Sequence, residues 1–186
     1  MKIIVSKIKK FVEEECKKST SKYGYEHYLH HILLVTKYAK RLAKEFNVDE
    51  EVIEIAALLH DIGSTKYGRK NHHINGAKIA EKKLREFEYE NEKIVKIKNC
   101  ILNHRGSIHS QRKSIEEKII ADADAISVFD NIEGQFNAAF VFEKKTQKQA
   151  RKSVKRKIIN SWKKISLIPS KNLVRKKFNA TMILFK

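Results

Sequence analysis

The sequence predicts an all-α fold, and two observations support this prediction. The chain of 186 residues contains only 6 glycines and 1 proline, whereas sheet proteins with many turns need more of both. Apolar residues recur at helical spacing in most segments, and no alternating strand pattern stands out. Hydrophobic residues make up 41% of the chain, enough for a packed core. We therefore expect one helical domain, with an appendage where the composition changes.

Three helices are expected in the first part of the chain. Residues 2–18 form an amphipathic helix that turns Ile4, Ile8, Phe11 and Val12 inward. A second helix starts near Glu26, and its apolar stripe consists of Leu29, Ile32, Leu33, Thr36, Ala39, Ala43 and Phe46. Asp49 is a plausible N-cap for the third helix. That helix is apolar almost all round, so we expect it to be central, with Gly63 as its C-terminal stop.

The remaining elements are also helical. A loop that contains Lys66, Gly68 and Arg69 follows the central helix. Further helices are expected at 73–88, 91–104, 115–130 and 132–150. A last amphipathic helix has its apolar face at Val154, Ile158, Ile159, Trp162 and Ile165. Pro169 is expected to end it.

Charge divides the chain into two parts. Lys and Arg number 40 against 22 Asp and Glu, for a net charge of +18. Residues 144–186 hold 15 of the basic residues and no acidic one, so residues 1–143 are close to neutral. The basic segment is either a strip that binds phosphate or nucleic acid or the solvated outer face of a packing helix. We divide the chain at residue 143.

Several classes of protein are excluded by composition. The chain has no run of 18 apolar residues, so no transmembrane helix is expected. Its N-terminal stretch lacks the apolar region of a signal peptide. Two cysteines, Cys16 and Cys100, cannot form a disulfide scaffold or a four-cysteine zinc site. We expect both to be small buried hydrophobes in a reducing compartment, and the protein to be cytoplasmic.

Histidines at two helices suggest a site. His31 falls at the edge of an apolar stripe, one turn after His27, whereas His30 should face water. His60 and Asp61 close the most hydrophobic helix, where a charge is costly unless it is paired or coordinates a cation. Imidazole and carboxylate together suit a divalent metal.

Polar residues of the same kind recur further along the chain. His72 lies at the start of a helix, and His104 lies at the edge of an apolar face. Asp122 and Asp124 lie on a helix that should belong to the core. Both are about 100° from its apolar centre, on opposite sides. Periodicity therefore does not choose between the two aspartates.

The order of these residues resembles the HD-domain metal-dependent phosphohydrolase superfamily. The motifs that carry the resemblance are HILLV at 31–35, LLHDIG at 58–63 and DADAI at 122–126. The resemblance covers about residues 25–130. This part of the chain is similar to small stand-alone bacterial and archaeal HD hydrolases. It implies an all-α HD-domain helical bundle, with residues 144–186 as a basic helical extension.

The resemblance also implies a site. It assigns one divalent ion, of Mn, Fe, Ni, Co or Mg, to His31, His60, Asp61 and Asp124. His72 and His104 match the extra histidines of the two-metal subgroup, so they imply either a second ion or contacts with phosphate. His27 and Asp122 would support the ligands.

These residues point to phosphoester or phosphoanhydride hydrolysis on a nucleotide or another small phosphorylated metabolite. Asp61 is also the nearest carboxylate for proton transfer. Three basic residues follow ligand residues and are expected to hold phosphate: Lys66, Arg69 and Arg105. Of these, Lys66 is expected to have a catalytic role. The first alternative is a phosphodiesterase or nuclease that binds RNA or DNA through residues 144–186. Another is a non-catalytic binding protein on an HD scaffold.

Overall fold

The computed structural model describes residues 2–105 and 112–185, and within these ranges it contains helices and no strand, which confirms the predicted all-α class. The α-helices are α1 (Lys2–Lys17), α2 (Gly24–His27), α3 (Leu33–Ala43), α4 (Glu50–Leu59), α5 (Ile62–Tyr67), α6 (His72–Glu86), α7 (Asn91–Asn103), α8 (Ile115–Ser127), α9 (Ile132–Asn137), α10 (Gln147–Lys164) and α11 (Ile168–Leu184). Two π-helical turns, η1 (Tyr28–Ile32) and η4 (Ala138–Phe142), and a 3₁₀ turn, η3 (Val128–Asp130), connect some of them.

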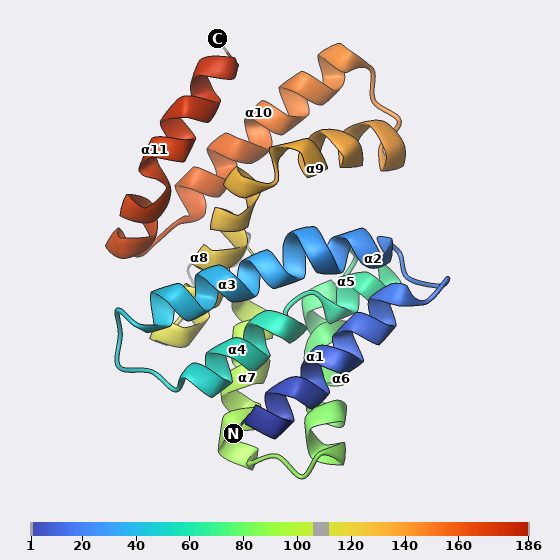
Figure 1. Ribbon diagram of the computed structural model, residues 1–186, viewed down its shortest axis with the longest axis vertical. Helices are drawn as coiled ribbons and strands as arrows, with labels where there is room; N and C mark the ends of the chain where they lie inside the picture. Colours follow the sequence, from blue (N-terminus) through green and yellow to red (C-terminus); the bar gives the residue numbers. More distant parts are fainter. Residues whose placement is uncertain (1, 106–111, 186) are drawn as a thin grey trace.

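Helix α4 is the centre of the lower bundle in Figure 1, where it packs against α1, α3, α7 and α8. Its residues from Val52 to Leu59 are buried except Glu54, as its nearly uniform apolar character predicts. Asp49 caps its first turn as predicted, because its side chain accepts hydrogen bonds from the backbone N–H groups of Glu51 and Val52. Helix α8 runs from this bundle to the upper group of α9, α10 and α11 (Figure 1).

Gly63 does not stop α4, and that prediction was wrong. The helix ends at Leu59, the next two residues form a turn, and Gly63 lies inside α5. A Cβ atom on Gly63 would lie 2.1 Å from the backbone oxygen of His72. The glycine is thus required because α5 and α6 approach closely, which sequence spacing does not reveal.

The expected helix from Glu26 is interrupted by η1. A π-turn inserts one extra residue and changes which side chains face the core. Tyr28 is therefore buried, whereas Leu29, predicted to be in the stripe, is 37% exposed. His30 faces outward as predicted, and His31 is half-buried.

Two helix boundaries near the C-terminus also differ from expectation. The predicted helix at 132–150 is split, because a capping box between Thr146 and Gln149 starts α10 afresh. Helix α10 ends at Lys164, five residues before Pro169. Pro169 therefore does not end that helix but occupies the first turn of α11. Proline is favoured there because the first turn needs no N–H donor.

The basic segment is a helical hairpin of α10 and α11 that packs on the rest of the chain. Helix α10 contacts α8 and α9, and α11 contacts α8 and α10. Apolar side chains of the hairpin belong to the same hydrophobic core as those of the bundle, namely Val154, Ile158, Ile165, Val174 and Phe185. The division at residue 143 is therefore a division by charge, and the packed core crosses it.

Two minor expectations concern the cysteines and membranes. Cys16 and Cys100 are free and buried, as predicted. Among the helices in the described ranges, none combines the length and the apolar character that crossing a membrane requires. The cytoplasmic location stays a prediction.

Candidate metal centre

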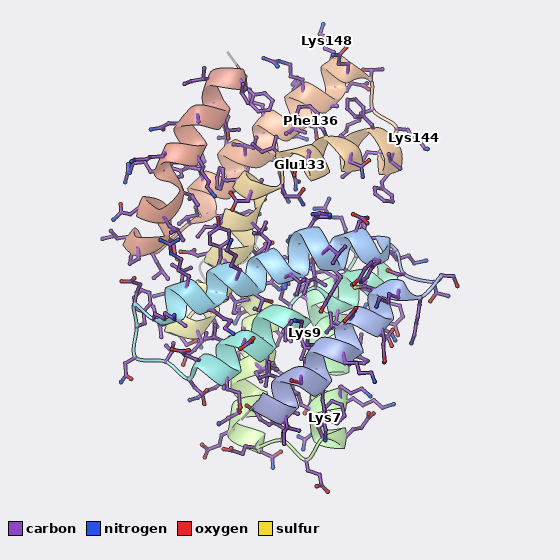
Figure 2. The ribbon with its side chains drawn as sticks, in the orientation of Figure 1. Lys7, Lys9, Glu133, Phe136, Lys144 and Lys148 are labelled. Carbon is purple, nitrogen blue, oxygen red and sulfur yellow. The ribbon has the colours of Figure 1, made fainter. Side chains whose placement is uncertain are left out.

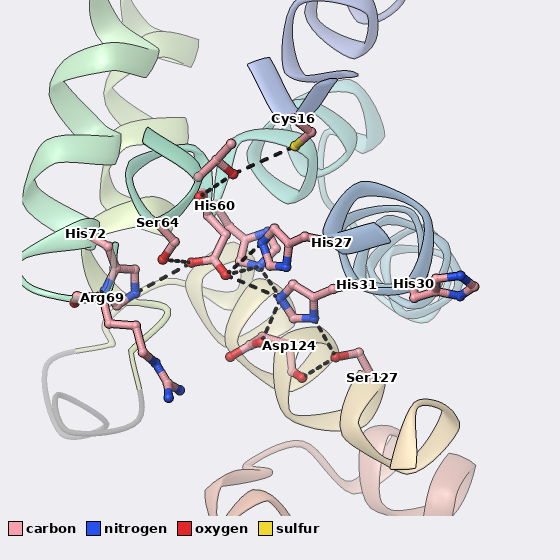
Figure 3. Close-up of polar contacts among 12 residues, drawn as sticks. Cys16, His27, His30, His31, His60, Ser64, Arg69, His72, Asp124 and Ser127 are labelled. Atoms are coloured by element: carbon pink, nitrogen blue, oxygen red, sulfur yellow. Dashed lines mark hydrogen bonds and ion pairs between the residues drawn. The ribbon is translucent and has the colours of Figure 1, made fainter. Parts of the chain in front are cut away.

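Six side chains from five separate stretches of the chain meet at one place. They are His31 of η1, His60 and Asp61 of the turn between α4 and α5, His72 at the start of α6, His104 just after α7, and Asp124 of α8. The ligand atoms of His31, His60 and Asp124 lie within 4.8 Å of one another, as do those of Asp61, His72 and His104. Figure 3 shows His31 between His60 and Asp124, whereas His30 points away.

The first group surrounds the Nε2 atom of His31. This atom lies 3.1 Å from Nε2 of His60, 3.5 Å from Oδ2 of Asp61 and 3.6 Å from Oδ1 of Asp124. Nε2 of His60 lies 3.9 Å from the same Oδ2 atom. Two imidazoles and two carboxylates therefore share one small volume.

The second group uses the other oxygen of Asp61. Its Oδ1 atom lies 3.7 Å from Nε2 of His72 and 3.9 Å from Nε2 of His104. The two imidazole nitrogens are 3.2 Å apart. The Asp61 carboxylate thus stands between two pairs of histidines, with one oxygen toward each pair.

Hydrogen bonds at the far side of the rings fix their tautomers. In three rings Nδ1 faces a backbone carbonyl oxygen, which can only accept: His60 with Ala57 at 2.7 Å, His72 with Arg69 at 2.9 Å and His104 with Ile101 at 2.6 Å. Each Nδ1 therefore carries the proton. In the neutral ring the lone pair is then on Nε2, which faces the site.

Ser127 fixes the fourth ring in the same way. Its hydroxyl donates to the backbone oxygen of Asp124 at 2.8 Å, so its oxygen can accept from Nδ1 of His31 at 3.3 Å. This leaves the Nε2 lone pair of His31 directed into the site. A hydrogen bond that orients the far side of a ring is typical of histidines that coordinate metal.

The resulting donor set fits a divalent cation. Four Nε2 lone pairs and two carboxylates converge, and two facing lone pairs cannot satisfy each other without a shared proton or cation. Burial lowers the pKa of His31 and lowers that of His104 to about 4, so these rings are neutral at pH 7. Neutral imidazoles with carboxylates suit borderline metals such as zinc, iron and manganese.

His27 lies beside this cluster, as its predicted supporting role requires. Its Nε2 atom is 3.5 Å from Oδ2 of Asp61, and its ring stacks on that of His31 with 4.9 Å between centroids. This buried nitrogen has no hydrogen-bond partner in the described part of the chain. It is thus a further donor directed at the same carboxylate.

Asp122 does not reach the cluster, which corrects its expected supporting role there. Its carboxylate is fully buried and accepts hydrogen bonds from N–H and Oγ–H of Ser166 and from N–H of Leu167. Residues two apart on a helix are about 200° apart around its axis, so Asp122 faces the hairpin while Asp124 faces the histidines. Asp122 anchors the turn between α10 and α11.

Lys66 also lies elsewhere, contrary to its expected role at the phosphate. It belongs to α5 rather than to a loop, and its ammonium pairs with the buried Glu15 of α1 at 2.8 Å. This ion pair directs the side chain away from the histidines. Arg69 and Arg105, by contrast, both line the pocket beside the cluster.

The cluster opens into a pocket of about 760 Å³ between the lower bundle and the upper helices. Four basic side chains line it: Arg69, Arg105, Lys157 and Lys164. Its other walls carry aromatic and amide side chains, namely Tyr23, Phe142, Asn131, Gln135 and Asn137. Sequence reasoning missed the two lysines, although their spacing of seven residues places them on one side of α10.

The fold and this cluster define a class: an all-helical protein built around histidine and aspartate side chains. The family model of the HD domain matches residues 28–128, which is more than half of the chain. The chain therefore belongs to the HD-domain family, as the sequence motifs indicated. Members of this family bind divalent metals.

Solved structures share the fold over nearly the whole chain. The Lin1889 protein of Listeria innocua has a TM-score of 0.74 at 19% identity, over 99% of this chain and 92% of its own. YpgQ of Bacillus subtilis, solved in complex with ADP, has a TM-score of 0.73 at 17% identity, over 97% and 93%. These overlaps are too large to leave out α10 and α11, so the hairpin belongs to the shared fold.

Two proteins that are similar to this chain in sequence are named as tRNA methyltransferases. Proteins of Picrophilus torridus and Thermoplasma volcanium, both named tRNA (cytidine(56)-2'-O)-methyltransferase, are 34% and 31% identical over 118 and 133 residues. The matches cover 56% and 63% of this chain but only 32% and 37% of theirs. An uncharacterized protein of Methanocaldococcus jannaschii is 32% identical over 53% of this chain and 65% of its own. The chain thus spans about a third of the methyltransferases that it matches.

Proposed function

We propose that this chain is a divalent-metal-dependent phosphohydrolase that acts on a nucleotide or another small phosphorylated metabolite. One observation carries the proposal: the converging Nε2 lone pairs and carboxylates open into a pocket lined by four basic side chains. Metal ligands beside cations are what phosphoryl transfer to water requires, because both relieve charge on the phosphoryl oxygens.

The residues would divide the work as follows. One ion would be held by His31, His60, Asp61 and Asp124, while His72 and His104 would hold a second ion with Asp61 or contact phosphate directly. A bound divalent ion lowers the pKa of water and polarises a phosphoryl oxygen. Asp61 is placed to accept the proton of the attacking water.

The pocket walls support a nucleotide. Arg69 and Arg105 offer guanidinium groups that bind phosphate in a bidentate manner. Tyr23 and Phe142 meet edge to face, with 6.1 Å between ring centroids, and provide an aromatic wall for a base. YpgQ, which shares the fold, was solved with ADP.

Hydrolysis of a nucleotide panel with Mn, Mg, Ni, Co and Fe ions tests the proposal. We expect phosphate or pyrophosphate release that depends on the added metal and is lost in His60→Ala and Asp61→Ala. The matched control for metal dependence is His30→Ala: His30 also lines the pocket, but its ring points away from the cluster (Figure 3), so activity should still depend on the added metal. Unchanged activity in the two cluster variants would overturn the proposal.

A second candidate is a phosphodiesterase or nuclease that binds RNA or DNA through residues 144–186. It is favoured by exposed cations of residues 144–186 that lie outside the pocket, such as Lys144 before α10 and Lys148 on it, which Figure 2 shows at the upper end of the molecule. The relatives named for tRNA modification also favour it. Its sign would be polynucleotide binding that falls steeply with salt and weakens in Lys148→Gln.

A further inference from the structure

Two lysines of α10 face the candidate metal centre from the opposite wall of the pocket. Lys157 and Lys164 are seven residues apart, so they lie on the same side of the helix. Both are half-buried and line the pocket together with Asp124. The ligand side chains come from η1, α6, α8 and the ends of α4 and α7, so these lysines are the contribution of the hairpin to the site.

Neither lysine forms an ion pair with a carboxylate in the part of the chain that the structure describes. In residues 2–105 and 112–185, no carboxylate oxygen lies within 4.0 Å of either Nζ atom. Glu26 and Glu133 also line the pocket, but neither comes within that distance. Lysines elsewhere do find such partners, as Lys40 does with Glu54 at 2.8 Å.

This arrangement is costly unless an anion completes it. Burial lowers the pKa of Lys164; the charge of Asp124 opposes this effect, whereas the charges of Lys157, Arg112 and Arg69 add to it. A partly buried ammonium without a partner destabilises the protein. A bound anion would remove that cost, since it would pair with both lysines.

The fold holds Lys164 in this position. The turn that follows it is anchored to the buried carboxylate of Asp122 by three hydrogen bonds, with distances of 2.9, 3.1 and 2.9 Å. Asp122 and Asp124 are on the same helix, so the anchor fixes the hairpin relative to a candidate metal ligand. The lysine is therefore a built part of the pocket wall.

We infer that Lys157 and Lys164 form a subsite for the phosphate groups of the substrate that are not attacked, which makes nucleoside di- or triphosphates the substrate class. The inference rests on the proposed function and deepens it. The two Cα atoms are separated by about 10 Å along the helix axis, which suits a chain of phosphates better than one phosphate group. Arg69, from the loop before α6, would face the same chain.

Binding of inorganic tripolyphosphate to the metal-free, full-length protein tests this subsite without catalysis. We expect calorimetry to show tighter binding of tripolyphosphate than of orthophosphate. The double variant Lys157→Gln/Lys164→Gln should lose at least about 10-fold in affinity for tripolyphosphate, as expected for the loss of charge-assisted hydrogen bonds. Lys164→Arg should retain most of the binding.

The matched control is Lys152→Gln/Lys163→Gln, which removes the same charge from exposed positions of the same helix. It should bind tripolyphosphate like the wild type. Thermal unfolding of both double variants checks that each is folded. The inference would be overturned if the two double variants lost the same affinity for tripolyphosphate, or if neither lost any. It would also be overturned if the wild type bound orthophosphate as tightly as tripolyphosphate.

The outcomes separate this inference from the proposed function. Metal-dependent hydrolysis of monophosphates, together with wild-type tripolyphosphate binding in the pocket variant, would overturn the subsite alone. Loss of tripolyphosphate binding in a protein that hydrolyses no nucleotide would overturn the proposed function alone. A short RNA serves as a second probe, and loss of RNA binding without loss of tripolyphosphate binding would also contradict the subsite.

Discussion

The histidine cluster and the α10–α11 hairpin differ in whether their polar side chains have partners within the protein. In the cluster, each of the four histidine rings has an orienting partner, such as Ala57 for His60 or Ser127 for His31. In the hairpin, Lys157 and Lys164 face the same pocket without a carboxylate within 4.0 Å in the described ranges. The cluster is thus arranged to hold a cation, and the hairpin side to meet an anion. A phosphorylated substrate between them would satisfy both.

The largest effect is expected where the two histidine pairs share one residue. Asp61→Asn keeps the size of the side chain but removes the negative charge that both pairs face. We expect the affinity for Mn²⁺ to fall by more than the roughly 10- to 100-fold that loss of a supporting partner costs. Calorimetric titration measures this, and His30→Ala should bind like the wild type. If Asp61→Asn bound Mn²⁺ with wild-type affinity, the claim that the cluster is arranged to hold a cation would be contradicted.

The next effect concerns the attachment between the two regions. Asp122→Ala leaves the N–H groups of Ser166 and Leu167 without their acceptor, at a cost of about 2 to 4 kcal/mol of unfolding free energy. Urea unfolding measures the loss. Metal affinity should change less than in Asp61→Asn, because Asp122 does not touch the cluster. An unfolding free energy equal to that of the wild type would mean that the anchor contributes nothing.

A smaller effect is expected at the contact between α5 and α6. In Gly63→Ala the new Cβ would lie 2.1 Å from the backbone oxygen of His72, so α6 must shift, at about 1 to 3 kcal/mol. The matched control is Gly76→Ala, whose Cβ would lie 3.3 Å from Cγ2 of Ile101 and needs little adjustment. Comparable unfolding free energies for the two variants would contradict the close-approach argument.

The smallest effect is a pH dependence of the hairpin contact. Asp130 accepts hydrogen bonds from Lys177 of α11 and Tyr38 of α3. Burial raises the pKa of Asp130, but these two hydrogen bonds outweigh it and hold the pKa below its ordinary value. A lowered pKa in the folded state stabilises the protein above the unfolded value of about 3.9, and the contribution is lost as the pH falls through the folded pKa.

Comparison of the wild type with Asp130→Asn isolates this contribution. The difference in unfolding free energy should be at most about 1 kcal/mol at neutral pH, because Lys177 is partly exposed. It should shrink below about pH 4. A difference that grows on acidification would show that the sign is wrong.

The sequence predicts the cluster better than the hairpin for a physical reason. Ligand-type residues such as His60 and Asp61 end apolar helices, where their polarity already requires an explanation, and the HD-type order adds to it. The positions of Lys66 and Lys164 depend on which neighbour each flexible side chain meets: the buried Glu15 for the first and the pocket for the second. Both are lysines near helix ends, and only tertiary packing tells them apart.

The roles of Asp122 and Gly63 also depend on tertiary contacts that the sequence does not reveal. Periodicity left Asp122 and Asp124 equivalent, and the choice became visible only when the α10–α11 turn was seen to cover one of them. The position of Gly63 after an apolar helix predicts a helix stop, because glycine is common at helix C-termini. Its actual role is set by α6, which approaches it from elsewhere in the sequence.

Anomalous diffraction from crystals grown with Mn²⁺ tests the central claim, that the converging histidines and aspartates hold a divalent ion, most directly. We predict an anomalous peak in contact with Nε2 of His31 and His60 and with a carboxylate oxygen of Asp61 or Asp124, and its absence in His60→Ala crystals. A wild-type crystal with no peak among these side chains, at Mn²⁺ concentrations that saturate binding in solution, would contradict the account.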